Sequence, residues 1–132
     1  MDTLAENYIY SSDLDQDILA ETYEGDLEYM HCMFETFVET IEEEIQLLAK
    51  VIEAKRLKEV RKIIHKIKPN FSMVGLTGHY QQAITLERLC DSLDAFSPEL
   101  EEKAVIFLNE VKTSRKIIHS ETQKLEQALS NT

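Results

Sequence analysis

The chain has 132 residues, and its contents of apolar (43%) and charged (30%) residues are ordinary for one soluble domain. The net charge of −11 argues against nucleic acid and anionic membranes as partners, because binding to either depends on Lys and Arg. Three glycines and two prolines are too few for the frequent turns of an all-β fold.

The sequence carries no sign of export or of a membrane span. No basic N-terminal stretch precedes an apolar one, and no apolar run approaches the roughly 20 residues that a spanning helix needs. The two cysteines, Cys32 and Cys90, lack a CxxC spacing and lie in apolar-periodic segments, which favours buried, reduced thiols. We therefore expect a soluble cytoplasmic protein.

Apolar residues recur every three or four positions along most of the chain, which is the period of an amphipathic helix. This pattern predicts a short first helix over about 14–23, ended by Gly25, and a second helix over 27–54 that Asp26 caps. Residues 1–12 precede these helices as a segment that is either flexible or docked on the domain.

Three more helices are predicted in the second half of the chain. Ser97 is expected to cap the last of them, with Pro98 at its first position. Long amphipathic helices with short connections predict an all-α domain over residues 13–130, an antiparallel up-down four-helix bundle with the short first helix across one end. The three helices cover residues 57–75, 79–93 and 98 to the C-terminal region.

Charge is distributed very unevenly along the chain. Residues 1–54 carry −14 and residues 69–132 carry −3, whereas residues 55–68 carry +6. This basic stretch also contains His65. It holds half of all the basic residues of the chain, namely Lys55, Arg56, Lys58, Arg61, Lys62, Lys66 and Lys68.

On a helix that turns about 100° per residue, His65 points almost opposite to the apolar stripe of the third helix. His65 therefore belongs to a solvent-facing patch that is mostly positive. The apolar stripe consists of Val60, Ile63, Ile67, Phe71 and Val74, and the patch around His65 contains Lys58, Arg61, Lys62, Lys68, Pro69 and Ser72.

A histidine in such a patch has a chemical use. Imidazole titrates near neutral pH, and neighbouring cations favour its neutral, nucleophilic form. An exposed neutral imidazole suits attack on an electrophile that brings negative charge, such as a phosphoryl group, and Lys68 one turn later would offset that charge. The alternative interpretation is a solvated basic helix face with an incidental histidine.

The residues after His65 resemble the signature of the histidine-containing phosphotransfer (HPt) domain family. In that signature a lysine follows the histidine at the third position, small residues follow at the fourth and near the seventh, and a glycine follows near the tenth. The resemblance covers about residues 14–95, and the C-terminal helix matches only in pattern. The matching residues are Lys68, Pro69, Ser72 and Gly75.

The resemblance implies a phosphoryl carrier and not an enzyme with its own phosphoryl donor. HPt domains bind no ATP; they accept a phosphoryl group on histidine from a phospho-Asp of one receiver domain and pass it to the Asp of another. His65 would be the phosphoacceptor, and Lys68 would stabilise the phosphoryl group. No cofactor is expected on this chain, because the receiver supplies the Mg²⁺.

The implied partners are the receiver domains of a hybrid histidine kinase and of a response regulator. The positive surface around His65 is opposite in charge to acidic receiver sites, although the chain as a whole is acidic. A monomer would suffice for such a carrier. The expected docking residues are Lys58, Arg61, Lys62, Pro69, Ser72 and Gly75.

Pro69 departs from the family, which usually has glycine at this position. A proline inside a helix has no N–H to donate to the carbonyl of His65, and its ring presses on that carbonyl. We expect a modest kink beside His65, which would change the exposure of the imidazole or its choice of partner.

Two other functions fit parts of the sequence. A bundle of the same fold would serve as an adaptor if it bound receivers without phosphotransfer. Glu28 and His31 match the E-x-x-H element of di-iron bundles, but the sequence has no second such element. His79 and His119 do not have the spacing of zinc ligands with either cysteine, so we expect no metal site.

Overall fold

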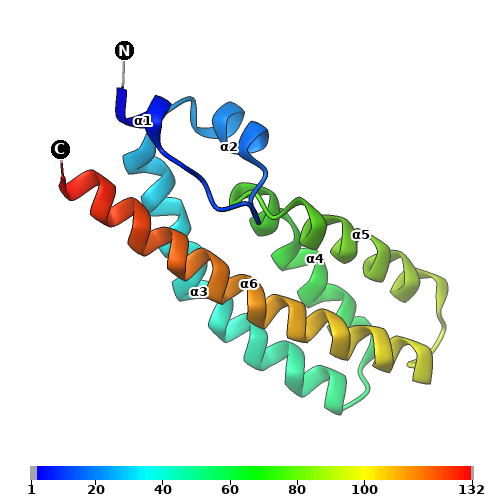
Figure 1. Ribbon diagram of the computed structural model, residues 1–132. Helices are drawn as coiled ribbons and strands as arrows, with labels where there is room; N and C mark the ends of the chain where they lie inside the picture. Colours follow the sequence, from blue (N-terminus) through cyan, green and yellow to red (C-terminus); the bar gives the residue numbers. More distant parts are fainter. Residues whose placement is uncertain (1–2, 132) are drawn as a thin grey trace.

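The computed structural model describes residues 3–131, which form six helices and no strands (Figure 1). Within this described part, no helix is both long enough and apolar enough to cross a membrane. The helices are α1 (Thr3–Asn7), α2 (Gln16–Tyr23), α3 (Leu27–Glu53), α4 (Leu57–Met73), α5 (Thr77–Ser92) and α6 (Pro98–Ser130).

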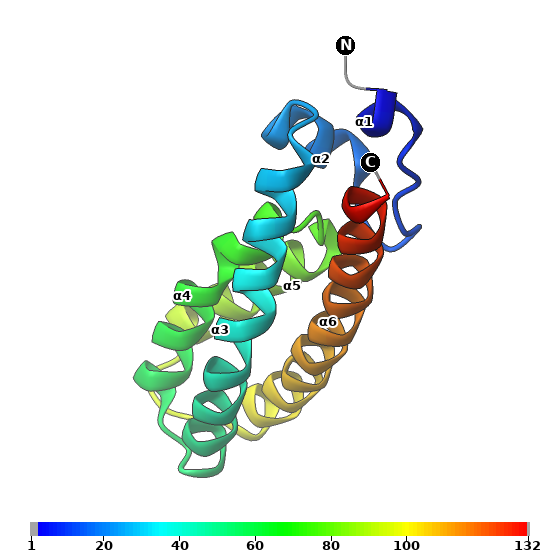
Figure 2. The same cartoon turned by 90° about the vertical axis from the view of Figure 1, so that its left-hand side faces the viewer.

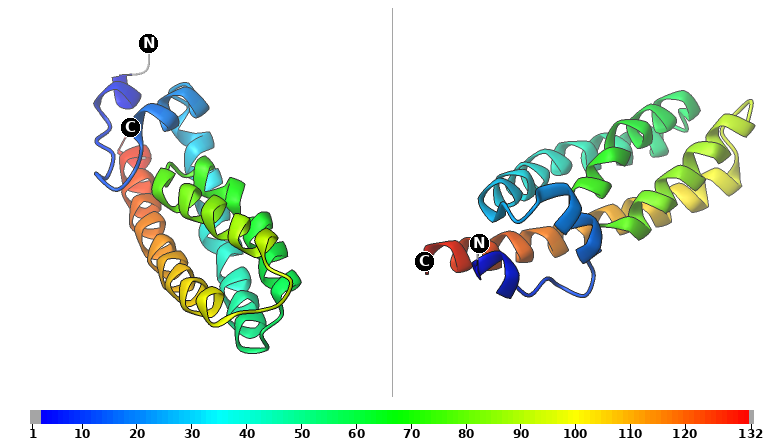
Figure 3. Two further views of the ribbon diagram at one scale, coloured as in Figure 1. Left: turned by 90° about the vertical axis from the view of Figure 1, so that its right-hand side faces the viewer. Right: turned by 90° about the horizontal axis from the view of Figure 1, so that it is seen from above.

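The four long helices α3, α4, α5 and α6 pack side by side around a common core (Figures 1 and 2). Helix α3 packs against α4 and α6, and α5 packs against the same two helices, so the four close a ring. Helix α2 lies against one end of this bundle, where it contacts α3 and α4 (Figure 3). The prediction of an all-helical bundle is confirmed for the described residues.

Large aromatic side chains fill the centre of the ring. Phe34 on α3, Phe71 on α4 and Phe107 on α6 are fully buried. The rings of Phe71 and Phe107 meet edge to face with their centroids 6.2 Å apart. Burying a side chain of this size contributes about 1.5–3 kcal/mol to folding, so these contacts hold α4 firmly against the bundle.

Polar caps set the beginnings of the helices. Asp26 and Ser97 each accept a hydrogen bond from the backbone N–H three residues later, as the sequence predicts for α3 and α6. Helix α2 begins slightly later than predicted, at Gln16, because Asp15 caps it by accepting a hydrogen bond from the N–H of Ile18. The αL backbone of Glu24 and Gly25 then ends α2.

The connection between α4 and α5 lies two residues earlier in the chain than the sequence pattern predicts. Helix α5 begins at Thr77 and not at His79. Gly75 has φ +75°, and the N–H of Leu76 donates to the carbonyl of Phe71, so the chain reverses within one turn. The predicted break at 76–78 is therefore wrong, because the reversal is completed at Gly75.

One predicted member of the apolar stripe of α4 is also misplaced. Ile64 is fully buried, whereas Ile63 is only partly buried and packs at the margin of the core. Ile64 follows Val60 by four residues and precedes Ile67 by three, which is the spacing of a single helix face. Ile64 therefore takes the central position that the sequence analysis gave to Ile63.

The N-terminal segment, residues 3–14, lies against the C-terminal half of α6 (Figure 1). Tyr8 is buried and its hydroxyl donates to Glu121 Oε2 at 2.9 Å, while the N–H of Ser11 donates to the same oxygen at 3.4 Å. Burial, together with the hydrogen bond to Glu121, raises the pKa of Tyr8 and keeps the hydroxyl a donor. The segment also contains α1, which the sequence analysis did not predict.

The two cysteines have different environments. Cys90 on α5 is buried, and burial raises the pKa of its thiol to about 11. Cys32 is exposed, so the expectation of a buried thiol is wrong at this position. The apolar stripe of α3 passes through Met30 and Phe34, and residue 32 lies two positions from each, which on a helix is away from that stripe.

Candidate functional site

His65 lies in the middle of α4 and faces solvent. Its side chain is 61% exposed, whereas Ile64 and Ile67 on the other side of the helix are fully buried. The period of α4 therefore places the imidazole on the outer surface, as the sequence predicts. Phe71, six residues later, anchors the same helix in the core.

The imidazole is held by a carboxylate from the neighbouring helix. His65 Nδ1 lies 3.0 Å from Oε2 and 3.3 Å from Oε1 of Glu87 on α5. Lys68 Nζ lies 3.3 Å and 3.4 Å from the same two oxygens. Glu87 and Lys68 are largely buried, with 12% and 21% of their side chains exposed. Glu87 thus joins the imidazole and the ammonium group into one cluster.

The electrostatics of this cluster favour an ionised Glu87. Partial burial by itself would raise the pKa of the Glu87 carboxyl. The hydrogen bonds with His65 and Lys68, and the charges of these two groups, outweigh it and hold the pKa below its usual range. The sequence analysis placed cations and small residues around His65 but no carboxylate. This picture was incomplete, because Glu87 Oε2 lies 3.0 Å from the ring.

The contact with Glu87 distinguishes the two ring nitrogens. Among residues 3–131, His65 bonds to the protein through Nδ1 alone. A carboxylate accepts but does not donate, so it favours the tautomer in which Nδ1 carries the proton. In that tautomer Nε2 of this largely exposed ring has a free lone pair, which a nucleophile requires.

The basic stretch around His65 is partly neutralised by neighbouring helices. Arg61 pairs with Asp91 on α5, and Lys66 Nζ lies 2.6 Å from Glu44 Oε1 on α3. Lys58 and Lys62 are exposed on α4 on the side of the basic stretch that precedes His65. The positive surface is therefore smaller than the +6 of the sequence indicates.

The three remaining predicted docking residues have different positions. Pro69 is exposed and Ser72 is partly exposed. Helix α4 continues past Pro69 to Met73, so the proline does not end it. Gly75 is buried, and a Cβ at this position would lie 2.9 Å from the side chain of Leu19. Gly75 therefore serves the turn after α4, which corrects its assignment to the exposed docking face.

Sequence analysis missed Glu87, although the sequence contains a signal for it. Helices α4 and α5 form an antiparallel hairpin, in which a step of four residues back along α4 matches four residues forward along α5. Arg61–Asp91 and His65–Glu87 obey this register. Two complementary pairs in one register would have indicated which residue of α5 faces His65.

The other histidines form no comparable cluster. His79 Nε2 lies 3.2 Å from the backbone oxygen of Glu110, and its ring packs 5.5 Å from that of Phe71. His31 is partly buried in α3, and His119 is exposed on α6. In the part of the chain that the structure describes, no three His, Cys, Asp or Glu side chains gather as metal ligands.

The described helices thus form a bundle that presents the exposed His65 beside Lys68 and Glu87. The sequence model of the Hpt domain family matches residues 33–131, which is most of the chain. The chain belongs to the Hpt domain family, whose members are phosphocarrier modules of phosphorelays and not kinases. The match includes α6, where the motif resemblance was only a pattern, and leaves out residues 14–32.

Comparison of the whole chain with individual proteins adds no relative. No curated protein and no solved structure matches the chain.

Proposed function

We propose that this chain relays a phosphoryl group between the aspartates of two receiver domains, with His65 as the intermediate carrier. The observation that carries the proposal is the His65–Glu87 contact, which occupies Nδ1 and leaves Nε2 free on an exposed imidazole. Family membership supports histidine phosphotransfer in general. The choice of His65, the receivers and the order of transfer are part of the proposal.

The transfer is a displacement at phosphorus. The lone pair of His65 Nε2 attacks the aspartyl phosphate of the donor receiver, the new N–P bond forms, and the P–O bond to the aspartate breaks. The Asp carboxylate leaves with the bonding electrons, so no proton has to move. The ring then carries a positive charge with its proton on Nδ1, and the Glu87 carboxylate at 3.0 Å balances this charge. The second transfer is the reverse displacement by a different aspartate.

Lys68 is proposed to stabilise the phosphoryl group during this exchange. Lys68 lies one turn after His65, and its ammonium group donates hydrogen bonds to the carboxylate of Glu87. This ion pair keeps the ammonium group close to the imidazole. An incoming phosphoryl group offers a stronger negative charge than one carboxylate, so Lys68 would turn toward the phosphoryl oxygens. The chain itself binds no ATP and has no autokinase activity in this proposal, and the receiver brings the Mg²⁺.

The receiver would dock over the exposed face of α4. Lys58 and Lys62 supply positive charge there, and Pro69 and Ser72 leave space near the imidazole. Complementary charge accelerates the encounter with acidic receiver sites. We propose the receivers of a hybrid histidine kinase and of a response regulator as partners, in the cytoplasm.

Incubation with a receiver that carries radiolabelled phosphoryl tests the proposal. We expect the label to move to the wild-type chain and to be absent from His65→Gln. The matched control is His119→Gln, which changes an exposed histidine on α6 and should accept label normally. Label retained by His65→Gln would overturn the assignment of His65. A receiver that binds the wild type but transfers no label would favour the adaptor function.

A further inference from the structure

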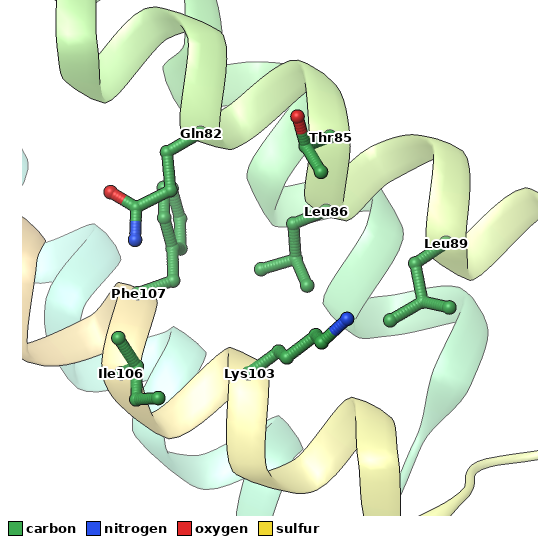
Figure 4. Close-up of a pocket in the computed structure, with 7 residues that line it drawn as sticks. All are labelled: Gln82, Thr85, Leu86, Leu89, Lys103, Ile106 and Phe107. Atoms are coloured by element: carbon green, nitrogen blue, oxygen red, sulfur yellow. The ribbon is translucent and has the colours of Figure 1, made fainter.

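An open apolar groove runs between α5 and α6 (Figure 4). It encloses about 290 Å³. The buried side chains of Leu86 and Phe107 form its floor, and the Ile106 side chain stands beside it, 50% exposed. Figure 4 shows Lys103 reaching from α6 toward α5 at one end of the groove, close to Leu89.

This groove faces away from the candidate phosphotransfer site. On α5, Thr85 and Leu89 line the groove and lie roughly 160–200° around the helix from Glu87. Glu87 contacts His65 from the opposite side of α5. A receiver over His65 would therefore leave the groove open, and the proposed function makes no use of it.

The surface next to the groove is an apolar ridge. Ile106 and its neighbour Val105 are 50% and 42% exposed, which puts two large apolar side chains in adjacent positions on α6. The same face of the molecule thus offers a ridge and a groove beside each other. A two-fold contact between identical chains buries the same patch of both copies, so one exposed apolar face can cover itself in this way.

Charges on α6 fit an antiparallel copy of the same helix. Lys103 precedes Ile106 by three residues and Glu110 follows it by four, and all three side chains point to the outer face beside α5. A two-fold axis near Ile106 brings Lys103 of each copy within about one residue, roughly 1.5 Å along the helix, of Glu110 of the other. A parallel copy would instead oppose identical charges.

The contacts between two copies would replace only weak ion pairs within each chain. Lys103 pairs there with Glu99 at 3.1 Å, and both side chains are more than half exposed. Glu110 is about half exposed, and its carboxylate lies 3.9 Å from His79. Exposed ion pairs contribute little to stability, so Lys103 is free to exchange its partner when a second copy approaches.

We propose that two copies of this chain associate weakly through the α5–α6 face, with their α6 helices antiparallel. Ile106 of each copy packs against Ile106 of the other at the two-fold axis, the two grooves face each other beside this contact, and Lys103 pairs with Glu110 across it. The His65 sites of both copies stay open on the far sides of their α5 helices. This inference does not depend on the phosphotransfer chemistry, and it goes beyond the monomer that a carrier requires.

Sedimentation velocity over a concentration series tests the contact. From about 10 µM to about 1 mM, the range of weak dimers, we expect the mean mass of the wild type to rise toward twice that of one chain. Ile106→Lys should stay monomeric, since it charges the ridge. Leu47→Lys is the matched control, because Leu47 is 41% exposed on α3, outside this face, and its variant should associate like the wild type.

A charge exchange tests the antiparallel register. Lys103→Glu and Glu110→Lys should each weaken association about tenfold, because each brings two like charges together. The double variant restores opposite charges across the contact and should recover the wild-type association. A wild type that stays monomeric up to about 1 mM overturns the proposal. Dimers that are insensitive to Ile106→Lys, or a double variant no tighter than the single ones, would also overturn it.

Discussion

The Nδ1 atom of His65 and the carboxylate of Glu87 are 3.0 Å apart, although the two residues belong to different helices. This contact fixes the orientation of an otherwise exposed ring and identifies Nε2 as the nitrogen with a free lone pair. It also places a negative charge next to the proton on Nδ1. We therefore propose Glu87 as a positioning residue for the candidate nucleophile, and its effect on transfer should be measurable.

Glu87→Ala should slow phosphoryl transfer to His65 by at least about tenfold, because the ring loses both its preferred tautomer and the balancing charge. Glu87→Gln keeps an oxygen that accepts from Nδ1 but loses the charge, so its rate should lie between those of Glu87→Ala and the wild type. The measurement is the rate of label transfer from a phosphorylated receiver. Nitrogen NMR shifts of the His65 ring report the tautomer directly.

If Glu87 only stabilised the fold, its variants would lose stability and transfer together. The stability of each variant from urea unfolding serves as the control, since a folded variant with a slow rate separates positioning from unfolding. Equal transfer rates for Glu87→Ala and the wild type, with the ring tautomer unchanged, would contradict this role of the carboxylate.

Loss of the Lys68 ammonium group should lower the rate of phosphoryl transfer more than it lowers the affinity for the receiver. We expect Lys68→Ala to lower the transfer rate by about 100-fold, the lower end of the range typical for loss of one stabilising donor, and Lys68→Arg to recover part of the loss. Lys112→Ala is a matched control, because Lys112 is an exposed lysine on α6, outside the proposed docking face of α4. A Lys68→Ala loss confined to receiver affinity would count against the assignment.

The exposure of His65 was predictable because it depends on the helical period of α4 alone. Its contact with Glu87 does not follow from that period, because the pattern of one helix says nothing about its register against the next. The signal for this contact was the charge complementarity of α4 and α5, in the pairs Arg61–Asp91 and His65–Glu87. Gly75 shows the same limit in another form: its place in the motif marked it as functional, whereas its φ of +75° and the nearby Leu19 make it structural. The helical period of a sequence predicts which residues share a helix face, whereas the packing of the helices determines which residues of two helices meet.

The lowered pKa of Glu87 predicts a pH dependence of stability. A carboxyl group whose pKa is lower in the folded state stabilises the fold above its unfolded value, near pH 4.3, and loses this contribution as the pH falls through the folded value. The difference in unfolding free energy between the wild type and Glu87→Gln should therefore be larger at pH 7 than at about pH 3. Urea unfolding at both pH values measures it, and a difference that grows on acidification would refute the sign.

Pro69 lies four residues after His65, so the carbonyl of His65 receives no hydrogen bond from that position. Pro69→Gly should restore the bond and leave the bundle folded, with an unfolding free energy equal to or above that of the wild type, because glycine is tolerated better than proline inside a helix. We expect a changed transfer rate or partner preference. Unchanged kinetics with every receiver tested would show that Pro69 does not shape the site.

Gly75 tests whether a residue of the motif acts through the fold alone. Gly75→Ala should lower the unfolding free energy by about 3 kcal/mol, because alanine is strained in the left-handed region and its Cβ would press on Leu19. Gly78→Ala is the control, since its added Cβ would meet nothing within 4 Å outside the local backbone of its own helix and alanine favours helix α5. At a temperature where both variants are folded, they should transfer phosphoryl like the wild type. A stable Gly75→Ala variant with impaired transfer would instead support the predicted role of Gly75 in docking the receiver.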